Sequence, residues 1–289
     1  MADEQVIEIG FLNVVATPHP IGVYDRLLRS VAGEPVKFFG EQVAAITTPR
    51  AASGENHLLQ GRIVIWTDID EDQPGVNKRD LSAVRLSDMN FTVPNNLGFN
   101  GKVFFFTFKT TSHVLAYEAR NENGQTLSPR RAKRIFDLLM SPEILGLNAE
   151  LVEVTVIPED DALAFVLGLS RLDRVEILVK RPNQDDITDK ANAIMAELMA
   201  QHAKSEDRVL TRAGGSDGLE LSEENMVRAE VAATNGYVKS SGRDDEGEPD
   251  KRSTKEYPKI VRMVVDAGES FIGKVRDAAR NATARSGQS

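Results

Sequence analysis

A run of four basic residues is the strongest chemical feature of this sequence. Arg130, Arg131, Lys133 and Arg134 directly follow Ser128-Pro129, a pair that is typical of a helix start. The first turn of a helix presents free N–H groups and the positive end of the helix dipole. Bases placed there oppose the dipole at a cost of about a few tenths of a kcal/mol each. A bound anion such as a phosphate would compensate these positive charges. The alternative interpretation is that the bases form only a solvated face of the helix.

A second group of bases lies near the C-terminus, between Lys251 and Arg285. The pattern predicts a long helix from Tyr257 to about Arg285, whose last residues fray. Three bases of this helix are further candidates for phosphate contacts: Lys274, Arg276 and Arg280. Bases are favourable at the C-terminal end of a helix, so a solvated face is a stronger alternative here. Contacts of either group with phosphates would be independent of base sequence and sensitive to salt.

Other patterns that carry chemistry are incomplete. Asp68, Asp70 and Asp72 begin like a calcium loop, but Gln73 stands where the turn requires Gly and Arg79 where it requires Glu. The four histidines do not occur at the spacing of metal ligands, and no serine-hydrolase elbow is present. These absences favour a non-catalytic protein without a cofactor or a metal.

Composition sets the general class. The chain has 289 residues, with 35 Lys and Arg against 44 Asp and Glu, a net charge of −9, and no cysteine. Without cysteine, disulfide scaffolds, zinc–thiolate sites, iron–sulfur clusters and thiol catalysis are excluded. No apolar run approaches the ~20 residues of a membrane helix. Residues 1–8 carry acids and no base, unlike a signal peptide, so we expect a cytoplasmic protein without membrane insertion.

Charge is distributed unevenly along the chain. Residues 1–140 hold 15 bases and 16 acids, residues 141–250 hold 11 and 24, and residues 251–289 hold 9 and 4. The overall acidity argues against binding nucleic acid through the mean field of the protein. The overall acidity is compatible with local basic surfaces, because folding can place positive and negative charges on different parts of the surface.

The elements that must position these bases follow from periodicity. Alternating or β-branched runs predict strands, and the short connection at residues 110–112 predicts an antiparallel hairpin. The expected strands cover residues 6–16, 38–48, 58–69, 102–109, 113–121, 150–157, 174–180 and 208–212, and residues 237–241 and 250–254 form a further hairpin. The expected helices cover residues 23–31, 129–140, 159–168, 185–202 and 221–233. In the helix at 129–140, Ala132, Ile135, Phe136 and Leu139 face inward and the bases outward.

This order predicts an α+β fold in which mainly antiparallel sheets are faced by helices. We expect two domains. Residues 1–150 form an N-terminal α/β domain, and residues 151–289 form a C-terminal α/β domain with the long C-terminal helix.

Short strings throughout the chain resemble those of a known family, the RexA exclusion proteins of temperate phages. They are Phe11-Leu12-Asn13, Leu97-Gly98-Phe99, residues 127–139 (LSPRRAKRIFDLL) and residues 172–182 (LDRVEILVKRP). The chain is also similar to a bacterial family of unknown function, which shares residues 235–242 (NGYVKSSG) and 252–258 (RSTKEYP).

The resemblance implies a two-domain dimer that clamps duplex DNA in a cleft, without sequence preference and without enzymatic activity. It implies a role in phage exclusion, beside a small membrane or toxin partner protein. Carried over to this sequence, the DNA contacts would be Arg130, Arg131, Lys133 and Arg134, followed by Lys180 and Arg181. The strongly acidic stretch at residues 141–250 departs from such a role.

Two further functions stay open from the sequence. The acidic stretch favours a protein-interaction regulator or sensor of a defence system, without contact to DNA. A metal-dependent nuclease whose site assembles only in the fold ranks last.

Overall fold

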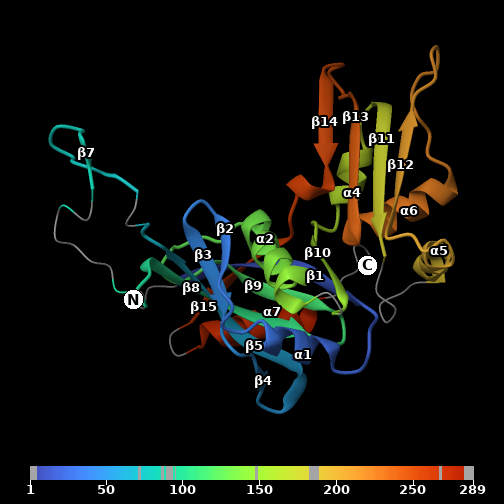
Figure 1. Ribbon diagram of the computed structural model, residues 1–289. Coiled ribbons are helices and arrows are strands. Elements are labelled where there is room, and N and C mark those ends of the chain that lie inside the picture. The colour runs from blue at the N-terminus through green and yellow to red at the C-terminus, as the bar shows by residue number, and fades with distance from the viewer. Residues whose placement is uncertain are drawn as a thin grey trace.

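The computed structural model describes residues 5–70, 73–85, 88, 94, 96–146, 149–181, 189–266 and 269–282 (Figure 1). For residues 189 and 190 it describes the backbone only. Over these residues the chain forms antiparallel sheets with helices packed against them, so the predicted α+β class is confirmed.

Nine strands of the described residues form one large antiparallel sheet. Its main path runs β10-β1-β9-β8-β5-β3-β2, while β15 also pairs with β1 and β4 with β5. The long strand β1 thus pairs with β10 and β15 along one edge and with β9 along the other. The strand bounds are Gln5–Thr17 (β1), Val36–Phe39 (β2), Gln42–Ile46 (β3), Arg50–Ala52 (β4), Glu55–Thr67 (β5), Phe99–Lys109 (β8), Val114–Arg120 (β9), Leu151–Val156 (β10) and Ile260–Val265 (β15).

The two faces of the large sheet bury different helices. On one face, Leu12 and Phe106 pack with α1 (Val23–Ser30) and α2 (Pro129–Leu139). On the other face, Phe11 and Ala116 pack with α7 (Phe271–Asn281). Neighbouring residues of one strand therefore point to opposite sides, as β geometry requires.

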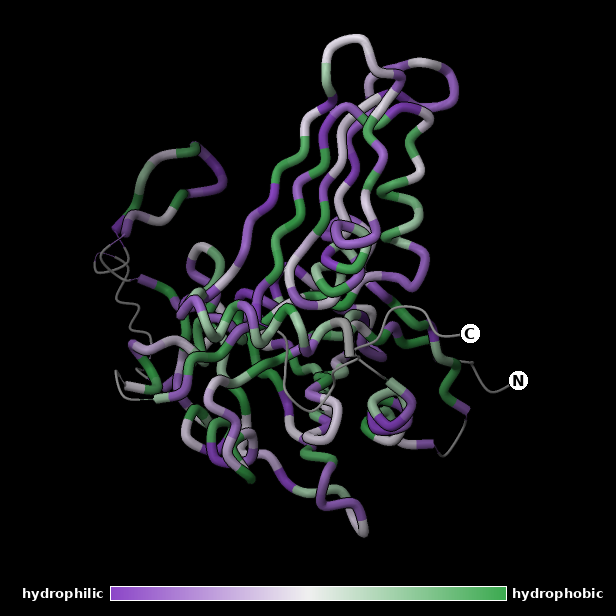
Figure 2. The backbone as a smooth tube through the Cα atoms, turned by 90° about the vertical axis from the view of Figure 1, so that its right-hand side faces the viewer, coloured by the Kyte–Doolittle hydropathy of each residue, from purple (hydrophilic) through white to green (hydrophobic). Residues whose placement is uncertain are grey.

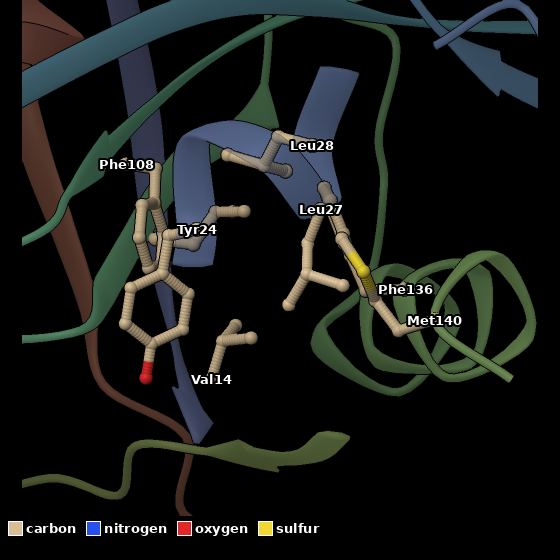
Figure 3. Close-up of a pocket in the computed structure, with 8 residues that line it drawn as sticks. Val14, Tyr24, Leu27, Leu28, Phe108, Phe136 and Met140 are labelled. Carbon is tan, nitrogen blue, oxygen red and sulfur yellow. The ribbon is translucent and has the colours of Figure 1, made fainter. Parts of the chain in front are cut away.

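The core beneath α1 and α2 is close-packed. Figure 3 shows Tyr24, Leu27 and Leu28 of α1 facing Phe136 and Met140 across a small apolar pocket of about 10 Å³. A space of this size has room for about one water molecule and not for a ligand.

A second sheet has the strand order β12-β11-β13-β14 and stands at the upper right of Figure 1. Its strands are Arg171–Lys180 (β11), Ser205–Thr211 (β12), Gly236–Arg243 (β13) and Pro249–Ser253 (β14). Buried Val175, Ile177 and Val238 point to the face that the helices cover. These helices are Ala162–Leu167 (α4), Asp189–Ala200 (α5) and Glu223–Thr234 (α6). Hydrophilic and hydrophobic residues alternate along the strands, as Figure 2 shows, which is typical of a sheet covered on one face.

Smaller elements complete the chain. They are a short pair of strands at Gly75–Val76 (β6) and Ala83–Val84 (β7), the helix Pro142–Leu145 (α3) and the 3₁₀ helix Thr254–Glu256 (η2). Among the described helices, none combines the length and the apolar sequence needed to cross a membrane.

The predicted long C-terminal helix is wrong in its first half. Residues 260–265 form strand β15, which pairs with β1, and α7 begins only at Phe271. The reason lies in the run Ile260-Val261-Arg262-Met263-Val264-Val265, because β-branched side chains favour a strand. Arg285 lies outside the described residues, as do residues 185–188 of the predicted helix at 185–202.

The predicted strand at 38–48 is also corrected. It is a hairpin of β2 and β3 that turns at Gly40, whose φ is +53°. The division into domains at residue 150 stays a prediction. Beyond that position, β10, β15 and α7 pack with the large sheet, while β11 to β14 form the second sheet.

Candidate nucleic-acid interface

Helix α2 carries the run of bases that the sequence singles out. It begins with Ser128 at the N-cap and Pro129 in the first turn, although the Ser128 side chain makes no capping hydrogen bond. Its buried residues are the predicted Ala132, Ile135, Phe136 and Leu139. This apolar face fixes α2 on the large sheet and directs the bases away from the core.

The four bases of α2 have different neighbours. The Arg131 guanidinium lies 4.2 Å from the centre of the Phe39 ring, and Arg134 Nε donates to the Phe38 carbonyl oxygen at 2.6 Å. Lys133 forms an ion pair with Asp137 one turn later. Arg130 is exposed and makes no ion pair with any described residue. The charge of Arg130 is therefore available to an external anion.

The predicted C-terminal bases lie elsewhere. Lys274 pairs with Glu269 at 2.6 Å. Arg280 pairs with Glu55 at 2.7 Å and with Asp277 at 2.8 Å. Arg276 lies 3.6 Å from Asp277. All three belong to α7, which covers the opposite face of the large sheet from α2, so the structure does not unite the two predicted basic groups.

Lys180 and Arg181 lie where the two sheets meet. Lys180, at the end of β11, forms an ion pair with Glu153 of β10, and Lys204 reaches the same carboxylate at 3.0 Å. Burial opposes ionisation of Glu153, but these two ammonium groups hold its pKa below the usual value. Arg181 Nε donates to the Ala203 carbonyl oxygen at 2.7 Å. Lys180 thus links the second sheet to the large one.

The second sheet separates charges of opposite sign. The strand residues that point away from α4, α5 and α6 form what we call the open face. Its cations are Arg174, Lys180, Lys239, Arg243 and Lys251, and its carboxylates are Glu176 and Asp207. Lys255 follows β14 directly and adds a further cation. Arg174, Arg243 and Lys251 are exposed, so the open face is basic although the surrounding stretch of sequence is acidic.

The helical side of the second sheet has the opposite character. Arg228 of α6 is only 6% exposed and is surrounded by carboxylates: Glu197 at 2.7 Å, Glu224 at 2.9 Å and Glu206 at 3.1 Å. A groove of about 430 Å³ between α5 and α6 is lined by Ala193, Ile194, Glu197, Glu223, Glu224, Val227 and Arg228. The acids of residues 141–250 therefore gather partly on the side away from the open face.

Four lysines are grouped at the junction of the two sheets. Lys239 of β13 and Lys255 of η2 lie against the Tyr237 ring, Lys180 of β11 points to the same face of the second sheet, and the charge of Lys133 of α2 acts on Lys255. We call these four the junction lysines. The sequence predicts the first two as DNA contacts and misses Lys239 and Lys255, although both lie in the strings NGYVKSSG and RSTKEYP. No spacing rule could have found this group, because its members come from four elements of both sheets.

No metal site is found among the described residues. In the segment that begins like a calcium loop, Asp68 accepts a hydrogen bond from Trp66 Nε1 at 2.7 Å, and Asp72 lies outside the described residues. His19 and His113 approach each other, with ring centres 4.7 Å apart, and both pack against Tyr24. This contact is a packing feature of the large sheet.

A comparison with protein families gives a match. A family model described as a domain of unknown function, DUF4747, matches residues 5–280. No curated protein matches the chain.

Proposed function

The chain belongs to the DUF4747 family, whose function is unknown, and we propose that it is a non-catalytic protein that binds the phosphate backbone of duplex DNA. The observation that carries the proposal is the open face of the second sheet, which concentrates cations in a chain of net charge −9. Arg130 on α2 adds an exposed cation that makes no ion pair with a described residue.

The chemistry of this surface favours backbone contacts over base readout. Lysine ammonium groups neutralise phosphates without distinguishing bases, and each contact releases counterions from DNA. Aromatic side chains that could stack on bases are scarce on the open face. Tyr237 lies there, but the ammonium groups of Lys255 and Lys239 lie 3.6 and 4.3 Å from its ring centre. We therefore expect binding without sequence preference and with strong salt dependence.

A gel shift with a duplex at about 50 and 200 mM salt, with magnesium present, tests the proposal. Arg130→Glu and Lys251→Glu each reverse an exposed charge without breaking an ion pair with a described residue. Each is expected to weaken binding and to reduce the slope of log K against log salt by about 1. Arg50→Glu, on β4 of the large sheet, reverses an exposed charge away from the interface and serves as the matched control (Figure 1).

Equal binding by all three variants would contradict the proposed interface. Absence of any shift at low salt would contradict DNA binding itself. Magnesium-dependent shortening of the duplex would identify a nuclease instead.

The resemblance to the RexA exclusion proteins supplies the biological setting of the proposal. We propose a cytoplasmic homodimer that clamps DNA during phage exclusion, beside a small membrane or toxin partner protein. The clamp predicts a mass of two chains in solution and a footprint that covers both protomers. The contacts of Lys274, Arg276 and Arg280 with DNA stay a prediction, since their face of the molecule is opposite to that of α2.

The groove between α5 and α6 favours a second candidate, a protein-interaction regulator of a defence system. Its glutamates lie beside Ile194 and Val227, a combination suited to a partner helix with both bases and apolar residues. Co-purification of one partner from infected cells, its loss in Glu223→Lys, and no DNA shift at low salt would select this function. Glu223 suits the test because it makes no ion pair with Arg228.

A further inference from the structure

The junction lysines combine charges that the protein itself does not fully neutralise. Lys133 has Asp137 as its carboxylate partner, Lys180 has Glu153, and Lys239 has Glu176 at 3.0 Å. Lys255 has no carboxylate partner among the described residues, and Glu153 is shared with Lys204. The junction therefore holds an excess of positive charge.

The position of Lys255 is fixed by its surroundings. The Val238 N–H donates to Thr254 Oγ1 at 3.1 Å, and the Lys255 N–H donates to Ser253 Oγ at 3.4 Å, so η2 is held against β13. The Lys255 ammonium lies 3.6 Å from the centre of the Tyr237 ring. The Tyr237 hydroxyl in turn donates to Glu176 at 2.7 Å, which fixes the ring. Lys255 is thus held against Tyr237 beside Lys239, and it stays exposed to solvent on its outer side.

This arrangement costs free energy. Partial burial of the ammonium, followed by the charges of Lys239, Lys133 and Lys180, lowers the pKa of Lys255, while Glu176 opposes the shift. Like charges at short range are tolerated where an external anion compensates them, and lysine is a common point-charge partner of phosphate.

We propose that the junction lysines, with Tyr237 as their support, form a binding site for a single phosphate group, with Lys255 as its central contact. The site joins α2 of the large sheet to the second sheet, so a bound phosphate would connect the two. The phosphate site would give bound DNA an anchor at one end of the open face. The inference therefore rests on the proposed function. The phosphate has two possible sources, a backbone phosphodiester and a free or terminal phosphate.

Calorimetric titration of the full chain with inorganic phosphate and pyrophosphate at low ionic strength tests the site. We expect saturable binding of one anion per chain, and Lys255→Gln is expected to weaken it about tenfold, because a charge-assisted hydrogen bond is lost. Lys251→Gln removes a lysine from the far part of the same open face and is the matched control. NMR of the lysine side chains should show that phosphate moves the Lys255 pKa back toward its usual value.

Binding to duplexes with and without a 5′-terminal phosphate distinguishes the two sources of the phosphate. Equal dependence on Lys255 identifies a backbone phosphodiester, whereas dependence only for the phosphorylated duplex identifies a terminal phosphate. Absence of saturable phosphate binding, or equal weakening by Lys251→Gln, would overturn the site. The two proposals can fail independently. DNA binding that depends on Arg130 and Lys251 would support the proposed function even if no phosphate site exists. Saturable phosphate binding that depends on Lys255 would support the site even if the chain does not bind DNA.

Discussion

Glu118 is a carboxyl group with no solvent exposure, on β9 of the large sheet. One of its oxygens accepts a hydrogen bond from the Phe105 N–H at 2.7 Å, and the other has no partner among the described residues. Burial raises the pKa of Glu118 to about 7, with the nearby charge of Glu122 contributing and the Phe105 N–H opposing. The folded protein therefore keeps this proton at pH values where the unfolded chain has lost it.

This residue predicts a fall in stability with rising pH. Below the unfolded pKa of 4.5, Glu118 is protonated in both states and does not lower the free energy of unfolding. Between pH 4.5 and about 7 the folded state binds more protons, so the free energy of unfolding contributed by this group falls by about 3 kcal/mol and then levels off. Urea unfolding across this range should show that Glu118→Gln removes this part of the pH slope. Glu34→Gln, which changes an exposed glutamate, is the control and should leave the pH slope unchanged. An unchanged slope in Glu118→Gln would contradict the raised pKa of Glu118.

At the scale of elements, the contact of β11 with β13 depends on glycine. A Cβ added at Gly236 would lie 1.9 Å from the Leu178 carbonyl oxygen, and one at Gly242 would lie 1.8 Å from the Arg171 carbonyl oxygen. Both neighbours are backbone atoms of the paired strand and cannot rotate away. Gly236 and Gly242 belong to the string NGYVKSSG, so the close approach of β11 explains why glycine stands at these two positions of the string.

We therefore expect Gly236→Ala to lower the free energy of unfolding by about 2 kcal/mol or more, because the strands must separate locally. Gly101→Ala on β8 is the matched control, since a Cβ there meets no atom within 4 Å. Chemical denaturation of both variants measures the difference. Similar stability of the two would show that β11 and β13 adjust without strain.

At the scale of the whole molecule, the sequence predicts local features better than distant ones. The largely buried, apolar run of β1 and the inward residues of α2 follow from neighbouring positions, and the structure has both. The pairing of β15 with β1 joins opposite ends of the chain, and no local pattern distinguishes that partner. The influence of the Lys133 charge on Lys255 has the same origin, because it depends on how α2 and η2 are brought together.

Part of the contact between the two sheets is buried and polar. Thr155 Oγ1 of β10 donates to the Thr234 carbonyl oxygen at 2.8 Å. Asn13 Nδ2 of β1 donates to Asn235 Oδ1 at 3.0 Å and to the same Thr234 carbonyl at 3.4 Å. Buried hydrogen bonds of this kind hold one relative orientation, since the carbonyl has no solvent to replace a lost donor.

These bonds predict that the two sheets unfold together. Trp66, the single tryptophan, lies on β5 and reports the large sheet by fluorescence, whereas far-UV circular dichroism reports both sheets. In urea the two transitions should coincide for the native chain and separate in the double variant Asn13→Ala, Thr155→Val, because the second sheet then loses its buried donors from the large one. Thr107→Val changes a buried threonine within the large sheet and should shift both transitions together. Transitions that already differ in the native chain, or that still coincide in the double variant, would show that other contacts decide the coupling.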